Sequence, residues 1–184
     1  MAEIPNSPRD PPEEASKHIL FISQIIKLDS RLVFPYFNAE TAWDLGCSIR
    51  LRLQTEFPDK ACLVSITRPT EPAVPLFACA TNDGTTVDNA RWVARKRATV
   101  LRWGCSTWTM RVKFNGDQLR FRDHYLLGET AEQYAIHGGG VPIKVKGVDG
   151  IVAVAVVSGL KQEQDYMLIV EEIERALNEI EDST

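Results

Sequence analysis

Apolar residues recur every three to four positions along four stretches of the chain, a spacing that predicts amphipathic helices. The first stretch spans residues 12–28, and the second runs from its N-cap Asn38 to Phe57. The other two span residues 87–103 and 160–180. The residues that share one side of each helix are, in order, Ile19, Ile22, Ile25 and Ile26; Ala42, Leu45, Gly46, Ile49 and Leu53; Trp92, Lys96, Thr99, Val100 and Trp103; and Tyr166, Val170, Ile173, Leu177 and Ile180.

Elsewhere the period of the pattern shortens to two, which predicts strands. The most regular alternation is Ser106–Phe114, in which Trp108 and Met110 face one way and the threonines beside them the other. Residues 151–157 are nearly all Val, Ala and Ile, the composition of a central strand covered on both faces. The predicted strands are residues 61–67, 76–80, 106–114, 141–146 and 150–158.

These elements predict an α+β fold, an antiparallel five-stranded sheet with helices packed on it, because most connections are too short for parallel crossovers. The last two strands form a hairpin. The polar, weakly patterned residues 115–133 predict one or two short helices and a loop. The expected divisions are a disordered leader at 1–11, a single domain at 12–180 and a frayed acidic tail at 181–184.

Composition and charge narrow the class of partner. A formal net charge of −4 provides no global basic field, which argues against a nucleic-acid or anionic-membrane partner. No apolar run reaches the length of a membrane span. The cysteines form no C-x-x-C pair, which indicates reduced thiols and a cytoplasmic location. They are Cys47, Cys62, Cys79 and Cys105.

Three segments of the chain together resemble the haem-degrading-domain (GlcG/HbpS-like) family, in its bacterial and fungal branch. They are Asn89–Phe114, Tyr134–Lys146 and Ile151–Val170, which carry Gly-Gly-x-Pro, Val-Ser-Gly and an acidic helix start in the family's order. The resemblance covers roughly residues 40–178. It implies a profilin-like fold with three layers, α/β/α, a five-stranded antiparallel sheet and a homo-oligomer. Some members of the wider family bind haem or assist its degradation.

The first candidate site is His137 with Gly138–Gly140 and the following Pro142. Three glycines before a strand indicate positive φ, or a backbone that approaches another backbone or a ligand closely. An imidazole beside backbone N–H groups that carry no side chain is suited to ligate haem iron or to bind an anion. The alternative is that the glycines only permit a tight turn and that His137 is a hydrogen-bonded loop residue. We favour that alternative, since glycine's freedom in φ explains the pattern without a ligand.

The second candidate site is the basic side of the predicted helix 87–103. Arg91, Arg95 and Arg102 recur there at spacings of four and seven, accompanied by Lys96 and Arg97. Guanidinium groups bind phosphate and carboxylate groups, including haem propionates, in bidentate fashion. A solvated face, or ion pairs with a neighbouring subunit, is the favoured alternative.

The third candidate is Cys105 with Ser106. A thiol nucleophile needs a base and an orienting group, and the sequence offers only unplaced histidines. A buried, inert thiol is therefore favoured. The cysteines and histidines lack the spacing of a metal site. Glu163 and Asp165 are interpreted as complements of the helix dipole.

Three functions follow from these features. The first is a cytosolic, homo-oligomeric binding or scaffold protein without clear catalysis of its own. The second is a haem-binding or haem-processing protein that uses His137 and the helix arginines, with haem as its cofactor. The third is a chaperone-pathway interaction subunit that docks a protein adaptor through its acidic C-terminus, residues 179–184.

Overall fold

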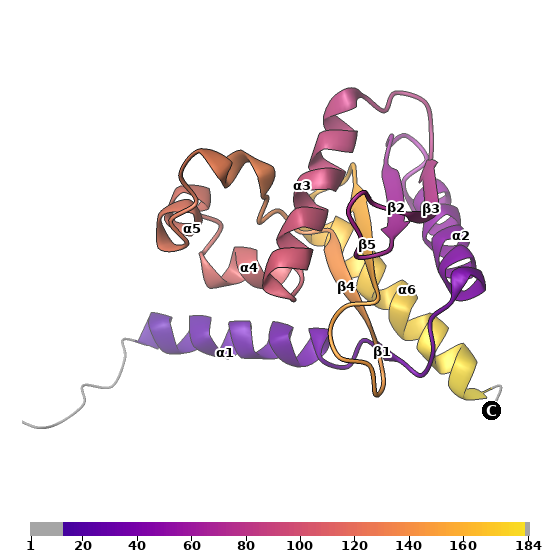
Figure 1. Cartoon of the computed structure of the whole chain (residues 1–184), viewed down its shortest axis with the longest axis horizontal. Coiled ribbons are helices and arrows are strands. Elements are labelled where there is room, and N and C mark those ends of the chain that lie inside the picture. The colour runs from indigo at the N-terminus through magenta and orange to yellow at the C-terminus, as the bar shows by residue number, and fades with distance from the viewer. Residues whose placement is uncertain (1–12, 183–184) are drawn as a thin grey trace, which may run out of the picture.

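The computed structural model describes residues 13–182, which form a five-stranded sheet with helices on both faces (Figure 1). The predicted leader, residues 1–11, lies outside the described residues, as do the last two residues of the predicted tail. The strands are β1 (Val33–Phe34), β2 (Leu63–Thr67), β3 (Pro75–Ala80), β4 (Gly140–Val145) and β5 (Ala153–Ser158).

The sheet is mixed, with the strand order β1-β4-β5-β2-β3. Strands β2, β3, β4 and β5 pair antiparallel, as predicted, whereas β1 pairs parallel to β4. Strand β5 lies at the centre and all of its residues are buried, which confirms the interpretation of its apolar run.

Helices cover both faces of the sheet and give the three layers α/β/α. Helices α2 (Ala39–Glu56) and α6 (Gln162–Asp182) pack on each other and on one face, and α3 (Val87–Trp103) packs on the other (Figure 1). The side chain of Asn38 caps α2 by accepting a hydrogen bond of 2.9 Å from the backbone N–H of Thr41. The buried residues of α2 are the five that its sequence pattern predicts.

The strand predicted at residues 106–114 is wrong, because this segment forms helix α4 (Thr107–Lys113). Gly104 ends α3 in the left-handed conformation, and Ser106 then caps α4 by accepting from the N–H of Thr109. Met110 and Phe114, one helical turn apart, pack together in a cluster with Phe121. Residues that alternate with a period of two also recur every four positions, which is about one turn of a helix. The same pattern therefore fits a helix, and tertiary packing decides between the two structures.

Two short elements follow α4, as the weak pattern of residues 115–133 predicts. They are α5 (Gln118–His124) and the 3-10 helix η1 (Gly128–Gln133). The fifth strand is β1 instead of 106–114, and its two residues are too few to show any period.

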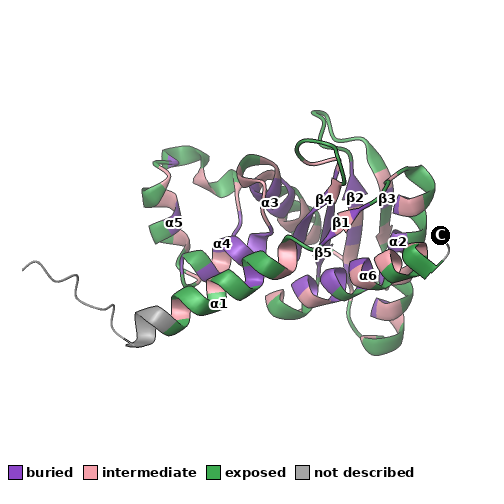
Figure 2. Cartoon of the chain, turned by 90° about the horizontal axis from the view of Figure 1, so that it is seen from below, coloured by how far each residue is buried: buried purple, intermediate pink, exposed green. Residues whose placement is uncertain are grey.

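Helix α1 (Glu13–Asp29) has the predicted position. It packs mainly on α4 and extends away from the sheet (Figure 2). Ile25 is buried, whereas Ile19 and Ile26 are 55% and 51% exposed. The predicted apolar side of this helix is therefore only partly buried within the chain.

Candidate functional site

Gly138 and Gly139 let the chain pass very close to α3 and α6 just before β4. The φ angle of Gly139 is +108°, and a Cβ there would lie 2.5 Å from the carbonyl oxygen of Val157 and 2.8 Å from Lys96 Nζ. At Gly138 a Cβ would collide with the backbone carbonyl oxygen of Gln162. Close packing and backbone conformation thus account for these glycines without a ligand.

A buried ion pair joins α3 to α6 beneath these glycines. Lys96 Nζ donates to Asp165 Oδ2 at 2.9 Å and to the carbonyl oxygen of Val157 at 2.8 Å. The two side chains are only 4% and 3% exposed. Asp165 Oδ1 accepts from the backbone N–H of Leu160 at 3.0 Å. Asp165, which lies in the first turn of α6 where an acidic residue complements the helix dipole, is therefore also the buried partner of Lys96.

Burial opposes charge on both members of the pair. It lowers the pKa of Lys96 and raises the pKa of Asp165, while the attraction between the two groups acts in the opposite sense on each. The pair is stable as an ion pair only because each partner is present, so loss of either one leaves an uncompensated buried charge.

His137 is half-buried beside the same pair. Its ring packs edge-on against Trp92, with 4.6 Å between the ring centroids. Burial lowers its pKa, and the cations Arg111, Lys96 and Arg95 lower it further. Its Nδ1 atom is buried and has no hydrogen-bond partner among the described residues. The imidazole is therefore neutral at pH 7, the form that ligates metals.

A pocket of about 280 Å³ connects these residues at one end of α3. We call it the His137 pocket. Gln162 contributes a side-chain oxygen, Oε1, that is also buried without a partner in the described chain. The residues that line the pocket are Asn89, Trp92, Lys96, His137, Ser158, Gly159, Leu160, Gln162 and Asp165.

A wider groove of about 880 Å³ lies on the outer side of α3, and Trp92 lines both the groove and the His137 pocket. We call it the α3 groove. The guanidinium of Arg95 lies 4.6 Å from the Trp92 ring centroid and donates to the carbonyl oxygen of Tyr134 at 3.0 Å. Exposed Arg91 is 3.6 Å from Asp88, also in the groove.

The remaining basic residues of α3 do not join this groove. Arg102 donates to the Tyr134 hydroxyl at 2.8 Å and lies over the Trp103 ring. Arg97 is buried and binds the Thr67 hydroxyl and the Glu71 carboxylate, which fixes the connection between β2 and β3. The predicted basic side therefore divides into separate groups, of which Arg91 and Arg95 line the α3 groove and Arg95 also acts on the pKa of His137.

Cys105 and Ser106 lie away from the His137 pocket. Cys105 packs against the cluster that contains Met110 and Phe121, and burial raises the pKa of its thiol to about 11. Ser106 is fully buried as the cap of α4. Pro142 lies within β4, paired with Val154 of β5. Ser106 and Pro142 thus belong to secondary structure, whereas Cys105 is only partly buried, and its inertness stays a prediction.

The sequence analysis missed Asp165 and Gln162 as site residues. The available signal was Lys96, which shares one side of α3 with Val100 and Trp103. A lysine on the buried side of a helix requires a buried partner. The sequence does not say which carboxylate it is, because the partner lies 69 residues away in the chain.

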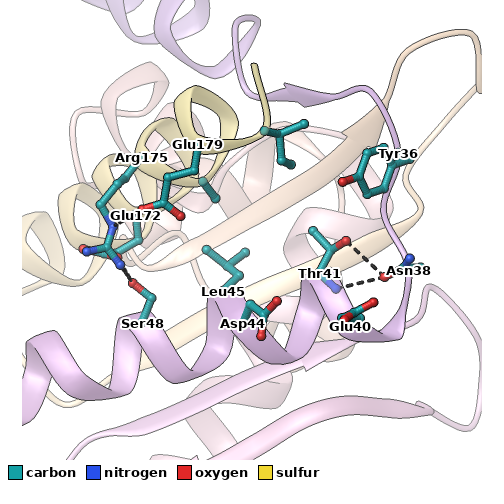
Figure 3. Close-up of a pocket in the computed structure, with 12 residues that line it drawn as sticks. Tyr36, Asn38, Glu40, Thr41, Asp44, Leu45, Ser48, Glu172, Arg175 and Glu179 are labelled. Carbon is teal, nitrogen blue, oxygen red and sulfur yellow. Dashed lines mark hydrogen bonds and ion pairs between the residues drawn. The ribbon is translucent and has the colours of Figure 1, made fainter. Parts of the chain in front are cut away.

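A second pocket, of about 430 Å³, lies between α2 and α6 on the opposite face of the sheet (Figure 3). Glu172, Glu179 and Asp44 give it an acidic lining, but Glu172 is already bound to Arg175 at 3.0 Å and to Arg52 at 3.4 Å. Among residues 13–182, no three His, Cys, Asp or Glu side chains are grouped to hold a metal ion. Within the same residues, no helix has the length and apolarity needed to span a bilayer.

The family model described as "Haem degrading protein HbpS-like" matches residues 37–174 of the chain. The chain belongs to the HbpS-like family. The match confirms the resemblance carried by the three sequence segments, and the region that it covers includes the His137 pocket and the α3 groove.

Named relatives of this HbpS-like protein cover nearly the whole chain. A UPF0303 protein of Psychromonas ingrahamii is 32% identical over 162 residues, which are 88% of this chain and 96% of the relative. UPF0303 protein YBR137W of Saccharomyces cerevisiae is 32% identical over 158 residues, 86% of this chain and 85% of the relative.

Solved structures confirm the fold. The crystal structure of the Ybr137w protein superposes with a TM-score of 0.78 at 28% identity and covers 90% of this chain and 95% of that one. A structure described as a PduOC:Heme complex has a TM-score of 0.57 at 17% identity and covers 77% of this chain and 95% of that one. At that identity the likeness shows the shared fold alone.

Proposed function

We propose that this HbpS-like protein is a binding protein for haem, which it holds on α3 between the His137 pocket and the α3 groove. The observation that carries the proposal is the neutral, half-buried imidazole of His137, next to Trp92 and to the groove that contains Arg91 and Arg95. The description of one fold neighbour as a heme complex supports haem as the ligand class.

The residues present fit such a ligand. The His137 pocket alone, at about 280 Å³, is smaller than the pockets that enclose drug-sized molecules, so a tetrapyrrole has to extend into the α3 groove. His137 would ligate the iron, Trp92 would contact the macrocycle, and Arg91 and Arg95 would bind the propionates. Bound haem supplies an iron atom to which a neutral ring nitrogen can coordinate.

Titration of the purified protein with hemin tests this proposal. We expect a saturable shift of the Soret band, loss of that shift in His137→Ala, and a weaker interaction in Arg91→Ala combined with Arg95→Ala. His124→Ala is the matched control, because His124 is an exposed residue on α5. An unchanged spectrum, or equal binding by His137→Ala with the fold intact by circular dichroism, would contradict the proposal.

A second observation favours self-association, the other part of the predicted scaffold role. Four large apolar side chains of α1 remain in contact with solvent: Ile19, Leu20, Phe21 and Ile26 are 55%, 62%, 44% and 51% exposed. Water contact at that many apolar groups on one projecting helix is unfavourable, and a second copy of the chain would bury them. We therefore propose a homo-oligomer in which α1 is part of the interface.

Light scattering on Ile19→Asp combined with Ile26→Asp tests the interface. We expect the mass to fall to that of a single chain, whereas Gln24→Asp, an exposed polar control on the same helix, keeps the assembly. An unchanged mass in the double variant would remove α1 from the interface. The predicted docking element at the acidic C-terminus gains no support, since residues 179–182 continue helix α6.

A further inference from the structure

The charged groups that line the His137 pocket cancel each other. Lys96 and Asp165 are its only Lys, Arg, Asp or Glu side chains, and they are ion-paired at 2.9 Å. His137 in the same pocket is neutral because burial lowers its pKa. Among the lining residues no charge is left unpaired, so the lining itself suits a neutral molecule.

Unused hydrogen-bonding capacity nevertheless remains on residues that line this pocket. The two bonds of Lys96 Nζ use two of its three N–H groups, which leaves one donor. Gln162 Oε1 and His137 Nδ1 are both buried without a partner in the described chain. A buried polar atom without a partner is costly, so these atoms call for a partner that enters the pocket.

The walls are fixed and their shape limits the size of the occupant. Gly138 packs closely on the Gln162 backbone and Gly139 packs closely on Lys96, so no space remains between the glycines and these two lining residues. Trp92 and Leu160 add apolar surface. At about 280 Å³ the pocket suits a molecule of one ring rather than an extended chain.

We propose that the His137 pocket binds a small, neutral, ring-sized molecule that carries a carbonyl oxygen beside an N–H group, the edge of a cyclic amide or a nucleobase. The carbonyl oxygen accepts from Lys96 Nζ, the N–H donates to Gln162 Oε1, and the ring packs on Trp92. This proposal does not rest on haem binding, although both ligands would contact His137 and would compete for the pocket.

Calorimetric titration with uracil, 1,3-dimethyluracil and benzoate tests the proposal on the full chain. Uracil offers the carbonyl and N–H edge, dimethyluracil has a similar shape without N–H donors, and benzoate is an anion of comparable size. We expect saturable binding of uracil alone. Loss of one neutral hydrogen bond in Gln162→Leu should weaken uracil binding about 10-fold.

Gln24→Leu is the matched control, because Gln24 is exposed on α1 and lines neither the His137 pocket nor the α3 groove. This control should bind uracil as tightly as the unmodified protein does. Both the control and Gln162→Leu should have the same unfolding midpoint as the unmodified protein. The proposal is overturned if uracil does not bind up to its solubility limit, which would mean a pocket filled by water. Equal binding of dimethyluracil or benzoate, or undiminished binding by Gln162→Leu, would also overturn it. A missing Soret shift with retained uracil binding would remove only the haem proposal.

Discussion

Gly139 is a position at which the candidate site tolerates an added methyl group poorly. Gly139→Ala must adopt a φ of +108° with a side chain and must also displace Lys96 Nζ or the Val157 carbonyl. Backbone strain and overpacking each cost about 1–3 kcal/mol, so we expect a loss of about 3 kcal/mol in the free energy of unfolding, measured with urea.

Gly147→Ala separates these two causes. Gly147 also has positive φ, +78°, but no atom lies within 4 Å of the position of its Cβ. We expect Gly147→Ala to lower the free energy of unfolding only by the cost of backbone strain, about 1 kcal/mol. Equal losses in the two variants would show that close packing at Gly139 contributes nothing.

The Lys96–Asp165 pair should behave as a unit. Lys96→Met leaves the Asp165 carboxylate buried and unpaired, at a cost of about 3–5 kcal/mol. Addition of Asp165→Asn removes the charge and keeps an acceptor for the Leu160 N–H, so the double variant should recover more than half of that loss. Denaturant unfolding of the two single variants and the double variant measures the coupling, and additive losses would contradict it.

His137 should reduce stability as the pH falls. Its pKa in the folded chain is lowered from the ordinary value of 6.5, so below that value the unfolded chain binds a proton that the folded chain binds less readily. Stability therefore decreases as the pH falls below about 6.5. His137→Gln removes this contribution, and its unfolding free energy should depend less steeply on pH between 7 and 5. An identical pH dependence would contradict a lowered pKa.

At the residue scale, the sequence indicates which residues are unusual but not what they contact. Gly138–Gly140 and His137 stand out because an imidazole and three consecutive glycines directly precede an apolar run. Their actual neighbours, Lys96 and Gln162, come from two other helices. Such contacts between distant segments leave no local pattern, so no spacing rule reveals them.

At the element scale, Asp29 connects three helices. Its two carboxylate oxygens at the end of α1 accept from the hydroxyls of Thr109 in α4 and Tyr166 in α6, both at 2.7 Å. Asp29→Ala deprives both hydroxyls of this acceptor, and we expect a loss of about 3 kcal/mol. Hydrogen exchange should accelerate in α1, which is otherwise held mainly by α4.

Asp123→Ala is the control for Asp29→Ala. Asp123 is exposed and pairs with its neighbour Arg122, so its loss should change stability by about 0.5 kcal/mol or less. Unchanged exchange in α1 of the Asp29 variant would show that apolar packing alone holds this helix.

The elements were predictable where burial has one simple period. Helices α2, α3 and α6 each have a consistent core side, and strand β5 is an apolar run buried along its whole length. The sequence places these elements, with β2 and β4, within a few residues. The pattern of segment 106–114 predicts the wrong element because Thr107 and Thr109 are buried rather than exposed. Thr107 accepts a hydrogen bond from the N–H of Gly140, and Thr109 donates one to Asp29. A period of two assumes that threonine faces solvent, and here it does not.

At the scale of the whole molecule, the three-layer body and the projecting α1 have separate roles in this account. The sheet and its helices position the His137 pocket at one end of α3 and the α3 groove along the outer side of that helix. Helix α1 presents apolar side chains to the outside (Figure 2). Association through α1 and binding at α3 should therefore be separable by mutation, and the double variant of Ile19 and Ile26 should still bind hemin.

The central claim is that haem binds at His137. The most direct measurement is light scattering in line with absorbance on the protein purified from haem-supplemented cells, because it reports mass and bound cofactor together. We expect a Soret band that follows the protein peak and is absent from the His137→Ala peak of the same mass. A colourless wild-type assembly, or an equal Soret band in the variant, would contradict the claim.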